Sequence, residues 1–194
     1  MSRPPEPADG KAEMTSRQRV LRCLEFRHPD RVPRDLWALP TVPRDHAPEL
    51  RRLLDEFPMD VAGPGEVLAR GDRQRGRPRR RGTCVDEWGS VWHAAEDGVI
   101  GEVQQPALAD WADLDRLTPP WEVIDRADWS AVDRARQDHG DRFLLTFTSV
   151  RPFERLQFLR GTENLLLDLG TGAGELRRLL EMVHEYNLRV LAGW

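Results

Sequence analysis

Residues 143–169 read FLLTFTSVRPFERLQFLRGTENLLLDL, and this stretch decides the predicted fold. It opens with a continuous apolar and β-branched run, 143–148, which predicts a central, buried strand. Pro152 favours the start of a helix after this strand, and Gly161 favours its end. A long helix near the C-terminus is predicted by apolar residues at helical spacing, Leu176, Leu179, Leu180 and Val183.

The residues before this stretch predict an α/β protein that begins with a helix. Thr15 and Gln18 have the spacing of a capping box, so a helix should begin there. Strands are predicted over residues 31–39 and 59–63, because both runs are β-prone and bounded by proline or glycine. Two further β-prone runs, 84–93 and 99–105, flank a turn at 96–98 and predict an inserted hairpin.

Composition limits the kind of protein this chain can be. Its 194 residues are 39% hydrophobic and carry a formal net charge of −4, which predicts one domain and gives no general attraction for nucleic acid. Residues 1–13 contain too little apolar surface to fold and are expected to be a disordered tail, with the domain spanning 14–194. The sequence has no apolar run typical of a signal peptide, and its two cysteines are widely spaced. These features predict a cytoplasmic protein without membrane partners.

Three segments together resemble the uroporphyrinogen decarboxylase superfamily, which also contains corrinoid-linked methyltransferases. They are MTSRQRVLRCLEFRHPDRVPRDLW at 14–37, VDEWGSVW at 85–92 and the stretch at 143–169. The resemblance implies a partial TIM-like (β/α)8 barrel with an inserted β-hairpin, because a whole barrel takes about 250 residues. We therefore expect a truncated chain, the N-terminal part of an enzyme whose family decarboxylates tetrapyrrole carboxylates or transfers methyl groups between corrinoids and thiols.

The resemblance also implies where the substrate, a small molecule, should bind. In such barrels the chemistry lies at the C-terminal ends of the strands. Asp35 and Trp37 fall at the end of the predicted first strand, where Asp35 is expected to be a catalytic carboxylate and the ring of Trp37 is expected to cover the substrate. The family's catalytic carboxylate that faces the pyrrole nitrogens falls near Glu66. Arg151 directly follows the strand at 143–148 and is expected to bind an anionic substrate.

The hairpin supplies two more candidate substrate-binding residues, Asp86 and Glu87. They belong to the DEWG sequence, which is similar to the methyltransferase branch of the superfamily. The family's arginine loop after the first strand is replaced here by ALPTVP at 38–43, which also favours that branch.

No cofactor is evident in this chain, and no metal site is predicted. None of the five histidines stands at metal-ligand spacing from a cysteine. The zinc ion and the corrinoid of the methyltransferase branch are expected only with the C-terminal half of the family's barrel.

Two other functions remain open from the sequence. LDLGTGAG at 167–174 matches the glycine loop of S-adenosylmethionine-dependent methyltransferases. We favour a turn between two helices instead, because that cofactor fold needs several further strands and only 20 residues follow Gly174. A non-catalytic half-barrel is the other possibility, and a homodimer would cover its open strand edge. The basic run at 70–82 has no interleaved aromatic residues, so we interpret it as a solvated loop.

Overall fold

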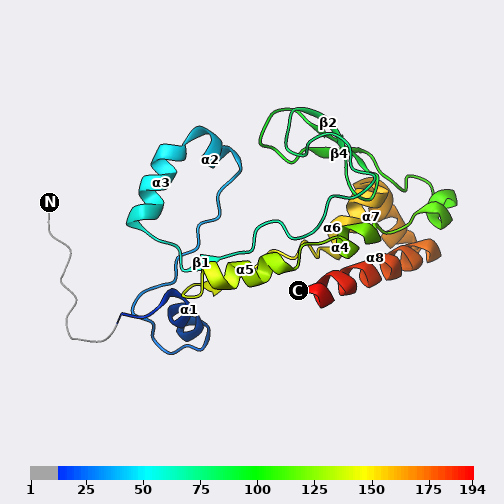
Figure 1. The fold of residues 1–194 in the computed structure, drawn as a ribbon. Helices are drawn as coiled ribbons and strands as arrows, with labels where there is room; N and C mark the ends of the chain where they lie inside the picture. The colour runs from blue at the N-terminus through cyan, green and yellow to red at the C-terminus, as the bar shows by residue number, and fades with distance from the viewer. Residues whose placement is uncertain (1–12) are drawn as a thin grey trace.

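The computed structural model describes residues 13–194 as a mixed α/β structure with two small sheets (Figure 1). The expected disordered tail, residues 1–13, lies outside the described residues except for Glu13. Within the described part of the chain, no helix is long and apolar enough to cross a membrane.

The N-terminal helix begins where the capping box predicted. Helix α1 spans Ser16–Leu24, and the Thr15 hydroxyl accepts from the Gln18 amide at 3.2 Å while the Gln18 side chain accepts from the Thr15 amide at 3.1 Å. Helices α2 (Thr41–Asp45) and α3 (Ala47–Glu56) follow. Local sequence determines the start of α1, since a cap needs only neighbouring residues, whereas α2 and α3 have no side-chain cap.

The strand predicted over residues 31–39 is wrong, because this segment has no regular secondary structure. One of its amides, that of Arg34, donates to the side chain of Asp60 at 2.7 Å, and no named strand pairs with the segment. A β-strand is stabilised only by hydrogen bonds to a neighbour, so the β-prone residues here remain extended and exposed.

Two strands far apart in the sequence form a parallel pair. Strand β1 (Val61–Ala62) pairs with β5 (Phe143–Leu144), with Val61 opposite Phe143. The strand predicted at 143–148 is therefore shorter than expected and is not buried, since Leu145 is 54% exposed and Phe147 is 70% exposed. A central strand needs neighbours on both edges, and β5 pairs only with β1, so the described residues contain no closed barrel.

The inserted hairpin is present and is one strand larger than predicted. Strands β2 (Gly82–Val85), β3 (Val91–Ala94) and β4 (Glu102–Gln105) form an antiparallel meander between the two parallel strands in sequence. The β2–β3 turn is fixed by the carboxylate of Asp86, which accepts from the amides of Trp88 at 3.0 Å and Ser90 at 2.9 Å.

Helices form the remainder of the fold. The 3₁₀ helix η1 (Trp111–Arg116) precedes five α-helices, and these are α4 (Trp121–Asp125), α5 (Ser130–Asp138), α6 (Pro152–Arg160), α7 (Thr162–Thr171) and α8 (Gly174–Gly193). In Figure 1, α4, α6, α7 and α8 lie together with the meander at one end, α1 to α3 lie at the other, and β1 and α5 lie between them.

Val20 of α1 is buried separately, but the main hydrophobic cluster lies at the end that contains α8. Its buried side chains come from the meander turn onward, and they are Trp88, Leu108, Leu114, Ile124, Leu156, Leu159, Leu165, Leu179, Val183, Tyr186 and Val190. The predicted stripe on α8 is partly confirmed, because Leu179 and Val183 are fully buried whereas Leu180 is 44% exposed.

Ion pairs, rather than apolar packing, hold the N-terminal segments against β1. Asp60 is fully buried and accepts from Nη1 of Arg19 at 2.5 Å and from Nη1 of Arg31 at 2.6 Å. Arg19 also pairs with Asp30 at 2.5 Å. Burial alone would raise the pKa of Asp60, but the hydrogen bonds from Arg31, Arg34, Ser16 and Arg19 outweigh it and hold that pKa well below its usual value.

Candidate functional site

A cavity of about 580 Å³ opens at the C-terminal side of the parallel pair. Since β1 and β5 are parallel, the chain leaves both strands at the same edge, and Glu66 after β1 and Arg151 after β5 both line the cavity. The meander turn contributes Glu87, and α8 closes the other side. A cavity of this size falls in the range of ligand sites, although no residue of β1 or β5 itself lines it.

Exposed charged side chains form the rim of this cavity. We call Glu66, Arg70 and Arg77 the rim residues; all three are exposed and line the cavity. Arg70 donates only to the backbone carbonyls of Gln74 and Gly76, at 3.3 and 3.4 Å. Within residues 13–194 neither Arg70 nor Arg77 forms an ion pair, so both guanidinium groups are available to an anion.

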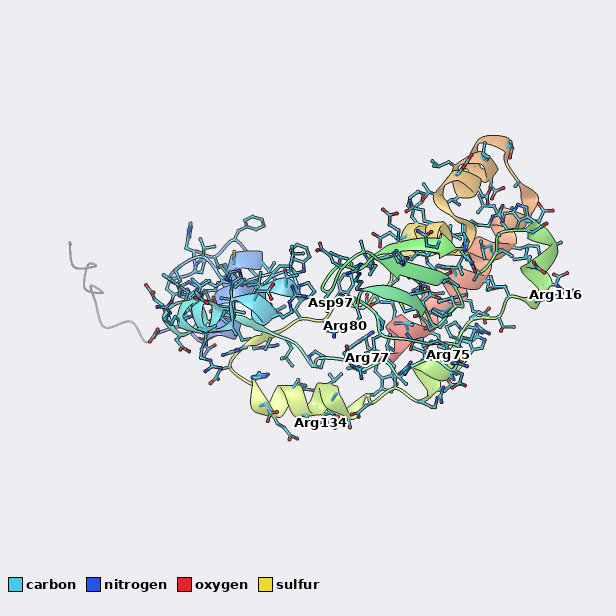
Figure 2. The ribbon with its side chains drawn as sticks, turned by 90° about the horizontal axis from the view of Figure 1, so that it is seen from above. Arg75, Arg77, Arg80, Asp97, Arg116 and Arg134 are labelled. Carbon is cyan, nitrogen blue, oxygen red and sulfur yellow. The ribbon has the colours of Figure 1, made fainter. Side chains whose placement is uncertain are left out.

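The basic run at 70–82, which carries these arginines, was interpreted as a solvated loop. Its side chains are largely exposed, but Arg70 and Arg77 also line the cavity. Figure 2 shows Arg80 beside Asp97, with Arg77 further along the same loop. Arg80 pairs with Asp97 at 3.2 Å and does not line the cavity, whereas Arg77 does. Neighbouring arginines of one basic run therefore have different environments, which the charge pattern alone does not reveal.

The other cavity arginines are already paired with carboxylates. Arg151 pairs with Glu154 at 2.5 Å and lies over the ring of Phe147 at 5.2 Å. Arg155 pairs with Glu87 at 2.8 Å and contacts Asp86 at 3.4 Å. Each pair is net neutral, so the rim rather than these pairs supplies the cavity's excess positive charge.

The floor of the cavity is buried and uncharged. Tyr186 and Asn187 are adjacent on α8, and they are 7% and 8% exposed. The Tyr186 ring makes an edge contact with Trp88 at 5.1 Å and a tilted contact with Trp121 at 5.6 Å, which fixes its position. Nδ2 of Asn187 is buried and has no hydrogen-bond partner among the described residues.

Alkaline titration should report directly on this floor, because Tyr186 is the only tyrosine in the chain. Burial, with a smaller contribution from Glu87, raises the pKa of Tyr186, against an opposing effect of Arg155. We expect no tyrosinate absorbance in the folded protein near the usual pKa of about 10. The neutral phenol stabilises the fold fully below that pH, and this stabilisation is lost as the pH rises toward the folded-state pKa. Reversible ionisation near pH 10 without unfolding would contradict the buried floor.

The residues predicted from the sequence are distributed as follows. Glu66, Glu87 and Arg151 line one cavity. Asp86 lies beside it, where its Oδ2 accepts from Nε1 of Trp92 at 3.0 Å, so it holds the meander turn together. Asp35 and Trp37 do not line the cavity, and both are exposed, Trp37 by 86%.

Sequence reasoning missed Arg155, Tyr186, Asn187 and the two rim arginines. Arg155 stands one helical turn after Arg151, so the same face of α6 predicts it. Tyr186 and Asn187 continue the buried stripe of α8 from Val183 to Val190, and a polar asparagine at a core position was the available signal.

The glycine motif at 167–174 does not form a strand-to-helix loop. Leu167 lies inside α7, Gly172 ends that helix in the left-handed conformation at φ 70°, and α8 begins at Gly174. The adenosylmethionine loop must follow a strand, so the geometry here is that of the alternative, a turn between two helices.

The residues present do not fit a zinc site. Among residues 13–194 no group of three or more His, Cys, Asp or Glu side chains is placed to hold a metal ion. Burial, with a contribution from Asp86, raises the pKa of the Cys84 thiol, which is the opposite of thiolate activation.

Comparisons with protein-family models, with curated proteins and with solved structures give no match to this chain.

Proposed function

We propose that this chain carries part of a uroporphyrinogen decarboxylase-like barrel and binds a carboxylated organic substrate in the cavity lined by the segments that follow β1 and β5. The reactions of that superfamily are the decarboxylation of tetrapyrrole carboxylates and methyl transfer between corrinoids and thiols. The observation that carries the proposal is the cavity itself, where residues after both parallel strands meet a rim with two arginines that form no ion pair within residues 13–194.

The distribution of polarity supports a ligand with an apolar body and anionic arms. Arginine pairs bidentately with carboxylates, so Arg70 and Arg77 would hold the arms at the rim. The floor contains Val123, Phe158 and Tyr186, which suit an apolar ring. A tetrapyrrole with peripheral carboxylates has this distribution.

Glu66 and Arg151 have complementary roles in this proposal. Glu66 is an exposed carboxylate on the rim and would accept from a pyrrole N–H, where it would stabilise the positive charge that the ring gains when it is protonated. Arg151 is 49% exposed and shares its charge with Glu154, so it would contribute to binding less than Arg70 or Arg77.

Titration of the full chain with uroporphyrin tests the proposal. We expect the Arg70→Gln/Arg77→Gln double variant to weaken binding about 100-fold or more, because it removes two charge-assisted hydrogen bonds to carboxylates that are worth roughly 1.5–3 kcal/mol each. Arg80→Gln is the matched control from the same loop, since Arg80 pairs with Asp97 outside the cavity. Calorimetry or fluorescence quenching gives the dissociation constants.

The control should stay within about threefold of the unmodified protein. Equal losses in both variants would mean that the loop attracts anions only by its general charge, and no binding of uroporphyrin would remove the tetrapyrrole reaction. A parallel titration with hydroxocobalamin addresses the methyl-transfer reaction, because saturable binding of the corrinoid alone favours it.

A homodimer that works as a partner module is the second candidate, and the exposed apolar residues beside β5 favour it. Leu145, Phe147 and Phe153 are 54%, 70% and 52% exposed. Side chains of this size are normally covered in a stable assembly. Sedimentation of the full chain as a single species of twice the monomer mass would support this candidate, and a concentration-independent monomer would remove it.

A further inference from the structure

We infer that Asn187 is a ligand-binding residue that hydrogen-bonds an uncharged acceptor oxygen of the substrate on the cavity floor. The inference rests on the proposal that this cavity is the substrate site, but it does not depend on which reaction occurs there. It assigns the site a ligand class, an organic anion whose body carries a carbonyl-type oxygen. Of the two substrate classes above, the amide side chains of a corrinoid supply such an oxygen, whereas the side chains of a uroporphyrin are all carboxylates.

The first observation is an unsatisfied donor. Asn187 is 8% exposed, and its Nδ2 is buried without a hydrogen-bond partner within residues 13–194. Leaving a buried amide unpaired is costly, and native proteins rarely do so without a functional reason. The same residue lines the cavity, so a bound molecule can reach it.

The second observation is the position of Asn187 on α8. Val183, Tyr186 and Val190 are buried around it at helical spacing, so this is a core position. A leucine of similar volume would fill such a position without the cost of an unpaired amide. A polar residue that local packing disfavours is typical of a functional site.

The surroundings determine what kind of group the amide can hold. Glu87 and Arg155 form an ion pair with each other at 2.8 Å, and burial keeps the adjacent Tyr186 phenol neutral. An anionic group would lose its hydration at this floor without meeting a free cation, because the unpaired arginines are on the rim. An uncharged acceptor receives the Nδ2 proton without that cost.

The test compares two probes that have the same charge and chain length, levulinate and valerate. Levulinate carries a keto oxygen and valerate carries a methylene in its place. We expect levulinate to bind the full chain about tenfold more tightly, with fragment-like dissociation constants on the order of 1 mM. Calorimetry measures both affinities.

Asn187→Leu should abolish this preference and raise the melting temperature, because it removes an unpaired buried amide and keeps the volume. Gln157→Leu is the matched control, since Gln157 is a carboxamide on α6 that bonds Thr162 at 3.3 Å and does not line the cavity. It should leave the preference for levulinate unchanged.

Several results would overturn the inference. Equal affinities of the two probes in the unmodified protein would mean that water, and not a ligand, satisfies the amide. The inference would also fail if the preference for levulinate survived in Asn187→Leu, or if that variant had a markedly lower melting temperature. It would fail as well if neither probe bound at several times 1 mM. Failure of uroporphyrin to bind would instead remove the tetrapyrrole reaction and leave the levulinate preference intact.

Discussion

We expect Asp60→Asn to lower the free energy of unfolding by about 3 kcal/mol, the lower end of the range for a broken buried pair, because it removes the buried carboxylate that pairs with Arg31 while Arg19 keeps Asp30. Asp60 is fully buried and accepts hydrogen bonds from Arg19 at 2.5 Å and from Arg31 at 2.6 Å. The main hydrophobic cluster does not reach α1 to α3, where Val20 is the one buried apolar side chain, so packing offers little compensation. Urea unfolding followed by circular dichroism measures the loss, and hydrogen exchange should locate it in α1 and β1.

The pH dependence of the same group gives an independent check. Because the pKa of Asp60 is lowered in the folded state, its contribution to stability is present above the unfolded-state pKa of about 3.9 and is lost as the pH falls through the folded-state pKa. Stability of the unmodified protein should therefore decline more steeply in acid than that of Asp60→Asn.

Asp113→Asn is the control for the Asp60 prediction. Asp113 pairs with Arg116 at 2.8 Å, but both side chains are more than half exposed. We expect a change of less than about 0.5 kcal/mol, the usual result for a surface pair. A comparable loss in both variants would contradict the role assigned to the buried network.

The second large effect is expected at Asp168, the last residue of the segment GTENLLLD. Asp168 is 8% exposed, and it accepts from Nε of Arg160 at 2.9 Å and from Nε1 of Trp111 at 3.1 Å. Arg160 also donates to the carbonyls of Leu108 and Ala109, at 2.7 and 2.8 Å. Asp168→Asn should cost about 3 kcal/mol, because Arg160 stays buried without its counter-charge.

A double variant distinguishes a broken ion pair from a general packing defect. Arg160→Met/Asp168→Leu removes both charges and keeps the volume, so it should be more stable than Asp168→Asn alone. Thermal unfolding followed by tryptophan fluorescence compares the variants. An Asp168→Asn protein within about 0.5 kcal/mol of the unmodified one would show that the network contributes little.

Features that depend on neighbouring residues were predictable from the sequence. The capping box of Thr15 and Gln18 identified the start of α1, and Gly161 identified the end of α6. The meander was predicted as a hairpin because turn residues mark it locally. The third strand was missed, since the turn at Asp86 interrupts a run that reads as one strand.

Features that depend on distant residues were not predictable. The segment 31–39 has strand-like composition, but whether it forms a strand depends on a pairing partner that composition does not reveal. Arg19 and Asp60 are 41 positions apart, so no local pattern connects them.

The candidate site follows the same division between local and distant signals. Arg151 was predicted because it directly follows a β-prone run, which is a local feature, and Glu66 was predicted from the family resemblance; both line one cavity. The loop arginines and the floor residues Tyr186 and Asn187 were missed, because only the folded chain places α8 against the segments that follow the two strands.

Amide chemical-shift mapping with uroporphyrin tests the central claim most directly, because the ring current of the macrocycle shifts nearby resonances strongly. The account predicts that saturation changes three separate segments together, residues 66–77 after β1, 148–155 after β5, and Tyr186 with Asn187 on α8. Shifts confined to exposed arginines outside the cavity, such as Arg116 and Arg134, would contradict it.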